Sequence, residues 1–172
     1  TLCFQLMASV LQPAVGLYTD KYPKPYLLPS GMVMTLLGLI LLALSSSFSM
    51  LLLASALIGM GSSTFHPEAS RVARLASGGR FGFAQSFFQV GGNAGSAFGP
   101  LLAAVIILPR GQTAIIWFSL FALLGIAVLS AVSRWTIRSG ASLKAVKKQP
   151  HFSHLSSAQV KGALLVLSLI HI

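Results

Sequence analysis

Long uncharged stretches alternate with short clusters of basic residues along this chain of 172 residues. No charged residue occurs in the stretches 1–19, 25–67, 81–109 and 111–133. A helix needs about 20 residues to cross the apolar core of a bilayer. The stretch 25–67 is therefore long enough for two such helices, and the serine-rich sequence at 45–49 predicts the turn between them.

The pattern predicts an all-α fold, a polytopic bundle of transmembrane helices. Six helical segments are expected, of which the first and the last are incomplete: 1–19, 27–46, 50–70, 82–108, 113–134 and 162–172. The apolar runs are continuous and lack the alternation of polar and apolar residues that the strands of a transmembrane barrel show. A soluble bundle of buried helices is the alternative, but these segments have too few polar residues for an outer face in water.

The composition excludes several classes of protein. Hydrophobic residues make up 55% of the chain and charged residues only 8%, whereas a soluble domain is about 25% charged. The chain has a single cysteine, so it cannot form an internal disulfide or a metal cluster with several cysteine ligands. We therefore exclude a soluble globular enzyme, a disordered tail and a disulfide scaffold.

The positions of the 12 Lys and Arg residues predict how the helices are oriented. All of them except Arg110 lie in or beside alternate loops of the predicted bundle. Loops rich in Lys and Arg stay on the cytoplasmic side of a membrane. The predicted cytoplasmic loops are 20–26, 71–81 and 135–161. The formal net charge of +10 is thus a signal of topology, and we expect no nucleic-acid partner.

The basic segment 136–161 contains Gly140, Pro150 and several serines, a composition typical of a linker. It divides the chain into a membrane unit over residues 1–135 and the start of another transmembrane helix at 162–172. We expect the linker to be cytoplasmic.

A first motif joins the first two predicted helices. Its matching residues are Gly16, Asp20, Lys21 and Lys24. The carboxylate of Asp20 can cap a helix N-terminus or pair with a cation. The motif resembles the pattern G-x-x-x-D-[RK]-x-G-[RK]-[RK] of the major facilitator superfamily, with Pro23 replacing the glycine and Pro25 the last basic residue. The resemblance implies a conformational latch; a plain capped turn with positive charge on the cytoplasmic side is the alternative.

A second motif lies in the predicted helix 82–108. Its residues are Gly91, Gly95, Gly99 and Pro100, and the glycines recur every four positions. Such a stripe allows helices to approach closely in lipid, and the proline permits a bend. The motif resembles the antiporter signature G-x-x-x-G-P-x-x-G-G of the same superfamily, with Ala103 and Ala104 in place of the last glycines. The resemblance implies an exporter; ordinary helix packing is the alternative.

A third group, His66 and Glu68, lies near the predicted cytoplasmic end of the helix 50–70. Ionisable residues inside a membrane are costly and usually face a cavity, and a histidine beside a carboxylate suits a proton relay. The alternative is an interfacial position in which Glu68 pairs with Arg71. A third metal ligand is lacking nearby, so we expect no metal site, and no nucleophile elbow indicates a hydrolase.

Gln85, Gln89 and Asn93 recur every four residues and predict a polar stripe on the helix 82–108. Such a stripe can line a water-filled substrate pathway. It can equally form hydrogen bonds between helices, and the sequence favours neither role.

The resemblance is closer to the bacterial fosmidomycin-resistance transporters than to the superfamily at large. The stretches that carry it are 11–13, 19–23, 61–68, 70–74 and 84–93. It covers most of residues 4–135 and fades in the linker. The last residues, 168–172, depart from it and are a candidate for non-native sequence.

The resemblance implies that the chain runs from the second helix to the start of the seventh in a twelve-helix transporter of the bacterial inner membrane. The first helix and the C-terminal half would then be its missing partners, together with the lipid bilayer, protons and a small-molecule substrate. Transport would be proton-coupled export of a phosphonate antibiotic or a similar compound, without a cofactor. Arg71 or Arg74 would attract the anionic substrate at the cytoplasmic mouth, or both would simply anchor the loop. A metabolite or sugar transporter, and a membrane protein that transports nothing, are the alternatives.

Overall fold

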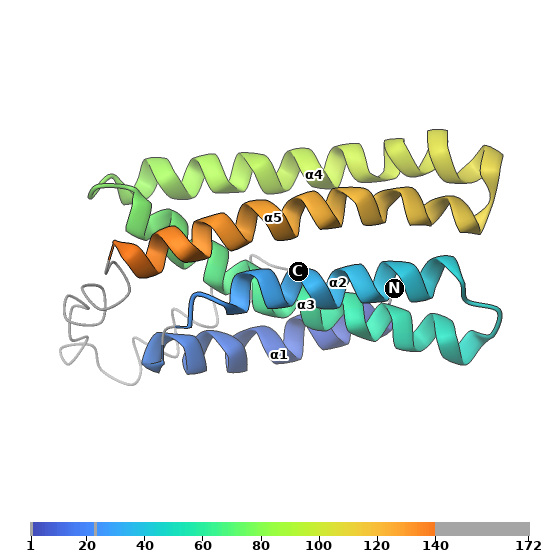
Figure 1. Ribbon diagram of the computed structural model, residues 1–172, viewed down its shortest axis with the longest axis horizontal. Helices are drawn as coiled ribbons and strands as arrows, with labels where there is room; N and C mark the ends of the chain where they lie inside the picture. Colours follow the sequence, from blue (N-terminus) through green and yellow to red (C-terminus); the bar gives the residue numbers. More distant parts are fainter. Residues whose placement is uncertain (1, 23, 140–172) are drawn as a thin grey trace, which may run out of the picture.

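The computed structural model describes residues 2–22 and 24–139. This part of the chain folds into five α-helices and one short 3-10 helix, without strands: α1 (Leu2–Lys21), α2 (Leu27–Ala43), α3 (Phe48–Ala76), α4 (Phe81–Arg110), η1 (Gln112–Ile115) and α5 (Ile116–Arg138). The α-helices lie lengthwise beside one another in an elongated bundle (Figure 1). The predicted all-α fold class is confirmed.

Helices α2 and α3 form the closest contact of the bundle. A Cβ atom added to Gly31 would lie 2.9 Å from the carbonyl oxygen of Gly61, and one added to Gly61 would lie 2.5 Å from that of Gly31. The two backbones therefore touch at this crossing, as small residues allow in membrane bundles. Gly59 lets α1 approach in the same way, since its Cβ would lie 2.8 Å from the carbonyl oxygen of Phe4.

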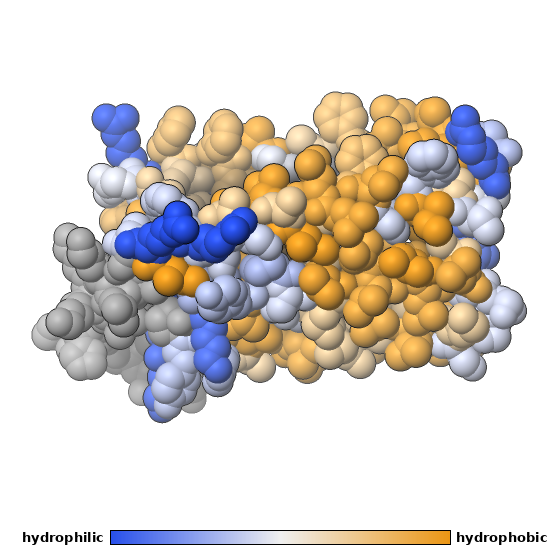
Figure 2. Space-filling model, in the orientation of Figure 1, coloured by the Kyte–Doolittle hydropathy of each residue, from blue (hydrophilic) through white to orange (hydrophobic). Residues whose placement is uncertain are grey.

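Two ends of the bundle can be distinguished. Helices α1, α3 and α5 end, and α2 and α4 begin, at the left in Figure 1; we call this the basic end because it carries Lys21, Lys24, Arg74, Arg80, Arg134 and Arg138. The opposite end carries Arg110. Figure 2 shows hydrophobic side chains over the middle of the molecule and hydrophilic ones towards both ends, as a membrane protein requires.

Four helices, α1, α3, α4 and the segment that continues from η1 into α5, are long and apolar enough to cross a membrane. The shorter α2 has 17 residues, the lower limit for a span. The predicted serine-rich turn is present, because α2 ends at Ala43 and Ser47 caps α3 by accepting a hydrogen bond from the backbone N–H of Met50 (3.3 Å).

The predicted end of the third helix at residue 70 is wrong. Helix α3 continues through Pro67 to Ala76, so the loop expected at 71–81 shrinks to residues 77–80 and Arg71 is helical. A helix of 29 residues is about 44 Å long, which exceeds the roughly 30 Å apolar core of a bilayer.

The end of α5 also differs from the prediction. The helix runs to Arg138, so the first residues of the predicted linker 136–161 are helical. The rest of the linker and the predicted helix start at 162–172 lie outside the described residues.

Helix α4 stands apart from the others. None of its 30 residues is buried, and a Cβ added to Gly91, Gly95 or Gly99 would meet nothing within 4 Å. Near its start, α4 is joined to α3 by a hydrogen bond from the hydroxyl of Ser70 to Oε1 of Gln85 (3.0 Å). Most of its length therefore presents an open surface in the described part of the chain.

Candidate functional site

Glu68 and Arg71 form an ion pair near the basic end of α3. Nε of Arg71 donates a hydrogen bond to Oε2 of Glu68 (3.0 Å), and Nη2 donates to Oε1. The side chain of Glu68 is wholly buried and that of Arg71 is 15% exposed. Two donors from one guanidinium hold the carboxylate in a fixed orientation, and the pairing offsets part of the cost of burying its charge.

Further side chains are buried on the three helices that pack in this part of the bundle. Thr19 of α1, Leu28 of α2 and Ser63 of α3 are all buried, and Pro67 lies 3.9 Å from the position that a Cβ on Gly16 would take. Helices α1 and α3 therefore approach each other one residue before Glu68. The candidate site is thus built where α1 ends, α2 begins and α3 approaches its end.

His66 is separated from this pair. Its ring is exposed and lies edge-on to Phe65, with 5.5 Å between the ring centroids, whereas Glu68 is buried. No hydrogen bond joins His66 to Glu68 in the described structure. The proton relay that these residues suggested in the sequence stays a prediction. No group of three or more His, Cys, Asp or Glu side chains in the described residues could hold a metal ion.

The predicted latch residues lie at the basic end. Gly16 accepts a hydrogen bond from the hydroxyl of Thr19 (3.1 Å), Asp20 and Lys21 are exposed at the end of α1, and Lys24 precedes α2. Within the described residues, Asp20 has no ion-pair partner. Their role as a latch stays a prediction.

The predicted polar stripe is divided by the structure. Gln85 is brought against α3, where its amide oxygen accepts a hydrogen bond from the hydroxyl of Ser70. Gln89 and Asn93 are exposed on the open surface of α4. Pro100 and the glycines of the second motif lie on the same helix and bring no other described helix into contact with it.

Sequence reasoning missed a cavity between three helices and a contact between distant parts of the chain. A cavity of about 240 Å³ lies between α1, α2 and α3 and is lined by Phe4, Met32, Thr35, Ile58, Ser62 and Phe65. Far along the chain, Nε2 of Gln112 donates to the carbonyl oxygens of Leu42 (2.7 Å) and Ser45 (3.0 Å) and to Oγ of Ser45 (2.6 Å). A lone Thr or Gln in an apolar sequence gives no sign of such partners.

Comparisons with known proteins agree with this architecture. A model of the Major Facilitator Superfamily matches residues 1–171. The chain is 66% identical over 135 residues to the fosmidomycin resistance protein of Escherichia coli (strain K12), covering 78% of this chain and 33% of that protein. It is 48% identical over 130 residues to YfnC, an uncharacterized MFS-type transporter of Bacillus subtilis (strain 168), covering 76% of this chain and 32% of that protein. No solved structure matches. The chain spans about a third of the length of these relatives.

Proposed function

The chain belongs to the Major Facilitator Superfamily, and from this membership we propose that it is part of a proton-coupled exporter of small molecules such as a phosphonate antibiotic. The observation that carries the proposal is the 66% identity to a protein named for fosmidomycin resistance. The apolar exterior and the candidate spans suit a multi-pass membrane protein and not an enzyme. The protein would lie in the bacterial plasma membrane.

In this proposal, α1 to α5 are the second to sixth helices of a twelve-helix transporter. The remaining two thirds of the length of the relatives would supply the first helix, the seventh and the C-terminal half. The open surface of α4 supports this, because exposed glycines and amides are unfavourable against lipid and suit a contact with another helix. The two halves would rock around a central path, as in other transporters of this kind.

The basic end would face the cytoplasm. Lysines and arginines gather where three helices end and two begin, and only Arg110 among the charged residues described lies at the opposite end. This asymmetry follows the positive-inside rule. Asp20, Lys21 and Lys24 would then lie in a cytoplasmic loop and act as the latch.

We assign the coupling step to the ion pair of Glu68 and Arg71. The ionised carboxylate would hold the guanidinium so that its remaining N–H groups bind an anionic substrate. Protonation of the carboxylate would break the pair and release that substrate, so that the proton and the substrate occupy the site in turn, as antiport requires. His66 would deliver the proton from the exposed side of α3, and the amide of Gln85 would contact the substrate near Ser70.

A metabolite or sugar transporter on the same scaffold is the second candidate. The relative from Bacillus subtilis carries a name that specifies only an MFS-type transporter, so the family supports transport without fixing the substrate.

The test uses inside-out vesicles that contain the full-length protein. We expect an imposed pH gradient, acidic inside, to drive the uptake of a labelled phosphonate, and a protonophore to abolish that uptake. Uptake that persists without a gradient would contradict antiport, and export of other compounds alone would contradict the phosphonate substrate.

A matched pair of variants tests the assigned step. Glu68→Gln keeps the size of the side chain but cannot exchange a proton, so gradient-driven uptake should be lost while exchange of substrate at equal pH persists. His66→Gln should slow uptake without abolishing it. Normal gradient-driven uptake by Glu68→Gln would overturn the assignment to Glu68 without touching the proposal of transport.

A further inference from the structure

Two tyrosines and two lysines form a cluster at the basic end of the bundle. The ring of Tyr18, in the last turn of α1, and that of Tyr22, directly after α1, lie with 5.6 Å between their centroids. Nζ of Lys21 lies 5.5 Å from the centroid of Tyr22, and Nζ of Lys24 lies 5.4 Å from that of Tyr18. Each ammonium group is therefore held against an aromatic ring. We call these four residues the tyrosine–lysine cluster.

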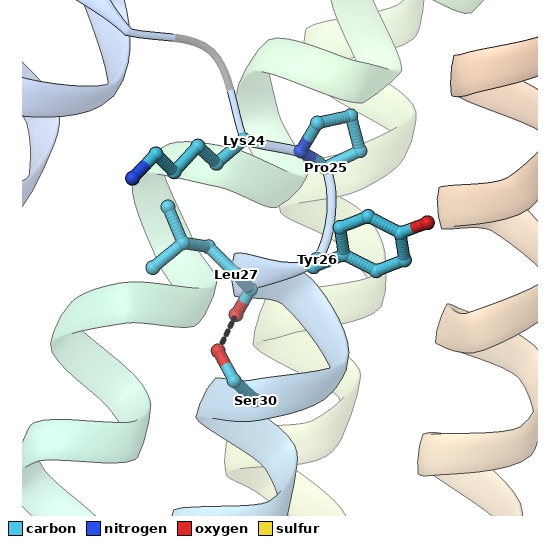
Figure 3. A pocket seen from close by; sticks show the side chains of 5 residues that line it. All are labelled: Lys24, Pro25, Tyr26, Leu27 and Ser30. Atoms are coloured by element: carbon cyan, nitrogen blue, oxygen red, sulfur yellow. Dashed lines mark hydrogen bonds between the residues drawn. The ribbon is translucent and has the colours of Figure 1, made fainter.

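A hollow of about 390 Å³ adjoins this cluster at the start of α2. It is lined by Lys24, Pro25, Tyr26, Leu27 and Ser30. Figure 3 shows the side chains of Lys24 and Leu27 on one side of this turn and the ring of Tyr26 on the other. The hydroxyl of Ser30 donates to the carbonyl oxygen of Leu27 (3.0 Å), so its lone pairs remain as acceptors. Lys24 is shared by the hollow and the cluster and places a positive charge at the edge of a mostly apolar surface.

The apolar side chains next to the cluster continue along the span. Leu17 precedes Lys21 by four residues, so the two share a face of α1, and the side chain of Leu17 is 74% exposed. A ligand that joins an anionic group to long hydrocarbon chains would match both parts of this surface. Lysines bind phosphate as point charges, and tyrosines favour the boundary between the apolar core and the headgroups.

We propose that the tyrosine–lysine cluster and the adjoining hollow bind the headgroup of one anionic glycerophospholipid from the cytoplasmic leaflet. Lys21 and Lys24 contact the phosphate, the phenols of Tyr18 and Tyr22 donate to headgroup oxygens, and the acyl chains follow the exposed apolar face of α1. The assignment to the cytoplasmic leaflet rests on the orientation proposed above; the binding chemistry does not.

The nearby carboxylate of Asp20 bears on the choice of lipid. Asp20 and Lys21 are adjacent on α1, so their side chains diverge by about 100° around the helix, and Asp20 is exposed. It reduces the local positive charge without lying on the face that Lys21 shares with Leu17. The two ammonium groups therefore favour an anionic headgroup over a zwitterionic one.

The test measures lipid binding to the full-length protein in detergent micelles by native mass spectrometry. Phosphatidylglycerol is titrated against phosphatidylcholine with the same acyl chains, and sn-glycerol 3-phosphate is added as the headgroup without chains. We expect phosphatidylglycerol to bind at least tenfold more tightly than phosphatidylcholine, and glycerol phosphate alone not to displace it. Because micelles have no sidedness and no transport is measured, a failure of the proposed function or orientation leaves this result unchanged.

Variants locate the site. Lys21→Gln combined with Lys24→Gln should weaken phosphatidylglycerol binding roughly thirtyfold, as expected for two lost lysine contacts. Lys21→Arg combined with Lys24→Arg should keep most of it, which also shows that the protein tolerates changes here. The matched control, Arg134→Gln with Arg138→Gln, removes the same charge from the basic end of α5 and should have little effect. The proposal would be overturned if both lipids bound with equal affinity, or if glycerol phosphate displaced phosphatidylglycerol. It would also be overturned if the two pairs of Gln substitutions weakened phosphatidylglycerol binding equally.

Discussion

The guanidinium of Arg71 holds the carboxylate of Glu68, one helical turn earlier on α3, although that carboxylate is fully removed from solvent. Burying an unpaired charge is far more costly than burying a pair. The two residues therefore depend on each other. The ionised carboxylate of Glu68 holds the guanidinium of Arg71 in place, and the guanidinium offsets the cost of burying that charge. This mutual dependence distinguishes them from the exposed basic residues at the same end of the bundle.

The first prediction concerns the stability of this pair. Arg71→Gln leaves the carboxylate of Glu68 buried without its partner, so we expect a loss of about 3 kcal/mol in the free energy of unfolding. The double variant Glu68→Gln with Arg71→Gln should recover much of that loss, because no charge is then buried. Denaturation followed by circular dichroism in detergent measures the three proteins. A double variant less stable than Arg71→Gln would contradict the dependence.

The ion pair also shows what the sequence could predict. Glu68 and Arg71 lie three residues apart, so the sequence indicated an ion pair between them as the alternative to a proton relay. Hydropathy located the helices and the turn before Ser47. The end of α3 was misplaced because Pro67 and the polar residues after it resemble a helix exit. In the structure they continue a single helix of 29 residues to Ala76.

Contacts between distant parts of the chain could not be predicted. Ser70 and Gln85 lie 15 residues apart, and Gln112 and Leu42 lie 70 apart. Each pair depends on how whole helices cross, which a single sequence does not reveal. The glycine stripe of α4 illustrates the converse: its spacing is plain in the sequence, but its partner is absent from the described residues.

The second prediction tests the crossing of α2 and α3. Gly61→Ala would place a Cβ 2.5 Å from the carbonyl oxygen of Gly31, so the helices must separate, and we expect a loss of about 2 kcal/mol. Gly82→Ala is the matched control, because its Cβ meets nothing within 4 Å. Thermal unfolding of both variants in detergent gives the comparison. Equal stability of Gly61→Ala and the parent chain would refute the backbone contact.

The third prediction concerns the tie at the end opposite the basic end. Gln112→Ala removes the donor to the carbonyl oxygens of Leu42 and Ser45, and each lost hydrogen bond is worth about 1 kcal/mol. We expect faster amide hydrogen exchange in residues 42–47. Gln112→Glu should have a stronger effect, because a carboxylate cannot donate and repels the carbonyl oxygens. Thr113→Ala serves as the control; the same acceleration there would show that the loop as a whole, not Gln112, stabilises this end.

The fourth prediction concerns the latch. Asp20 is exposed at the end of α1, so Asp20→Asn should leave membrane insertion and stability unchanged. It should lower transport by the full-length protein, because the neutral amide cannot make the charged contact proposed for the latch. Membrane content by immunoblot and vesicle transport separate the two effects. Transport at the parent level would remove Asp20 from the latch.

The last prediction concerns the open surface of α4. A Cβ added to Gly95 meets no atom within 4 Å in the described structure, and the residue lies on the exposed surface of α4, so Gly95→Leu should not destabilise this chain. In the full-length protein, we expect a helix to pack against the glycine stripe, and the added side chain would force it away. Transport should then fall close to background while the protein still inserts. Ala97→Leu, two residues further and on the other side of α4, adds similar bulk and should be tolerated. If Gly95→Leu transports normally, the stripe faces lipid; if Ala97→Leu fails equally, the contact does not depend on the glycine face.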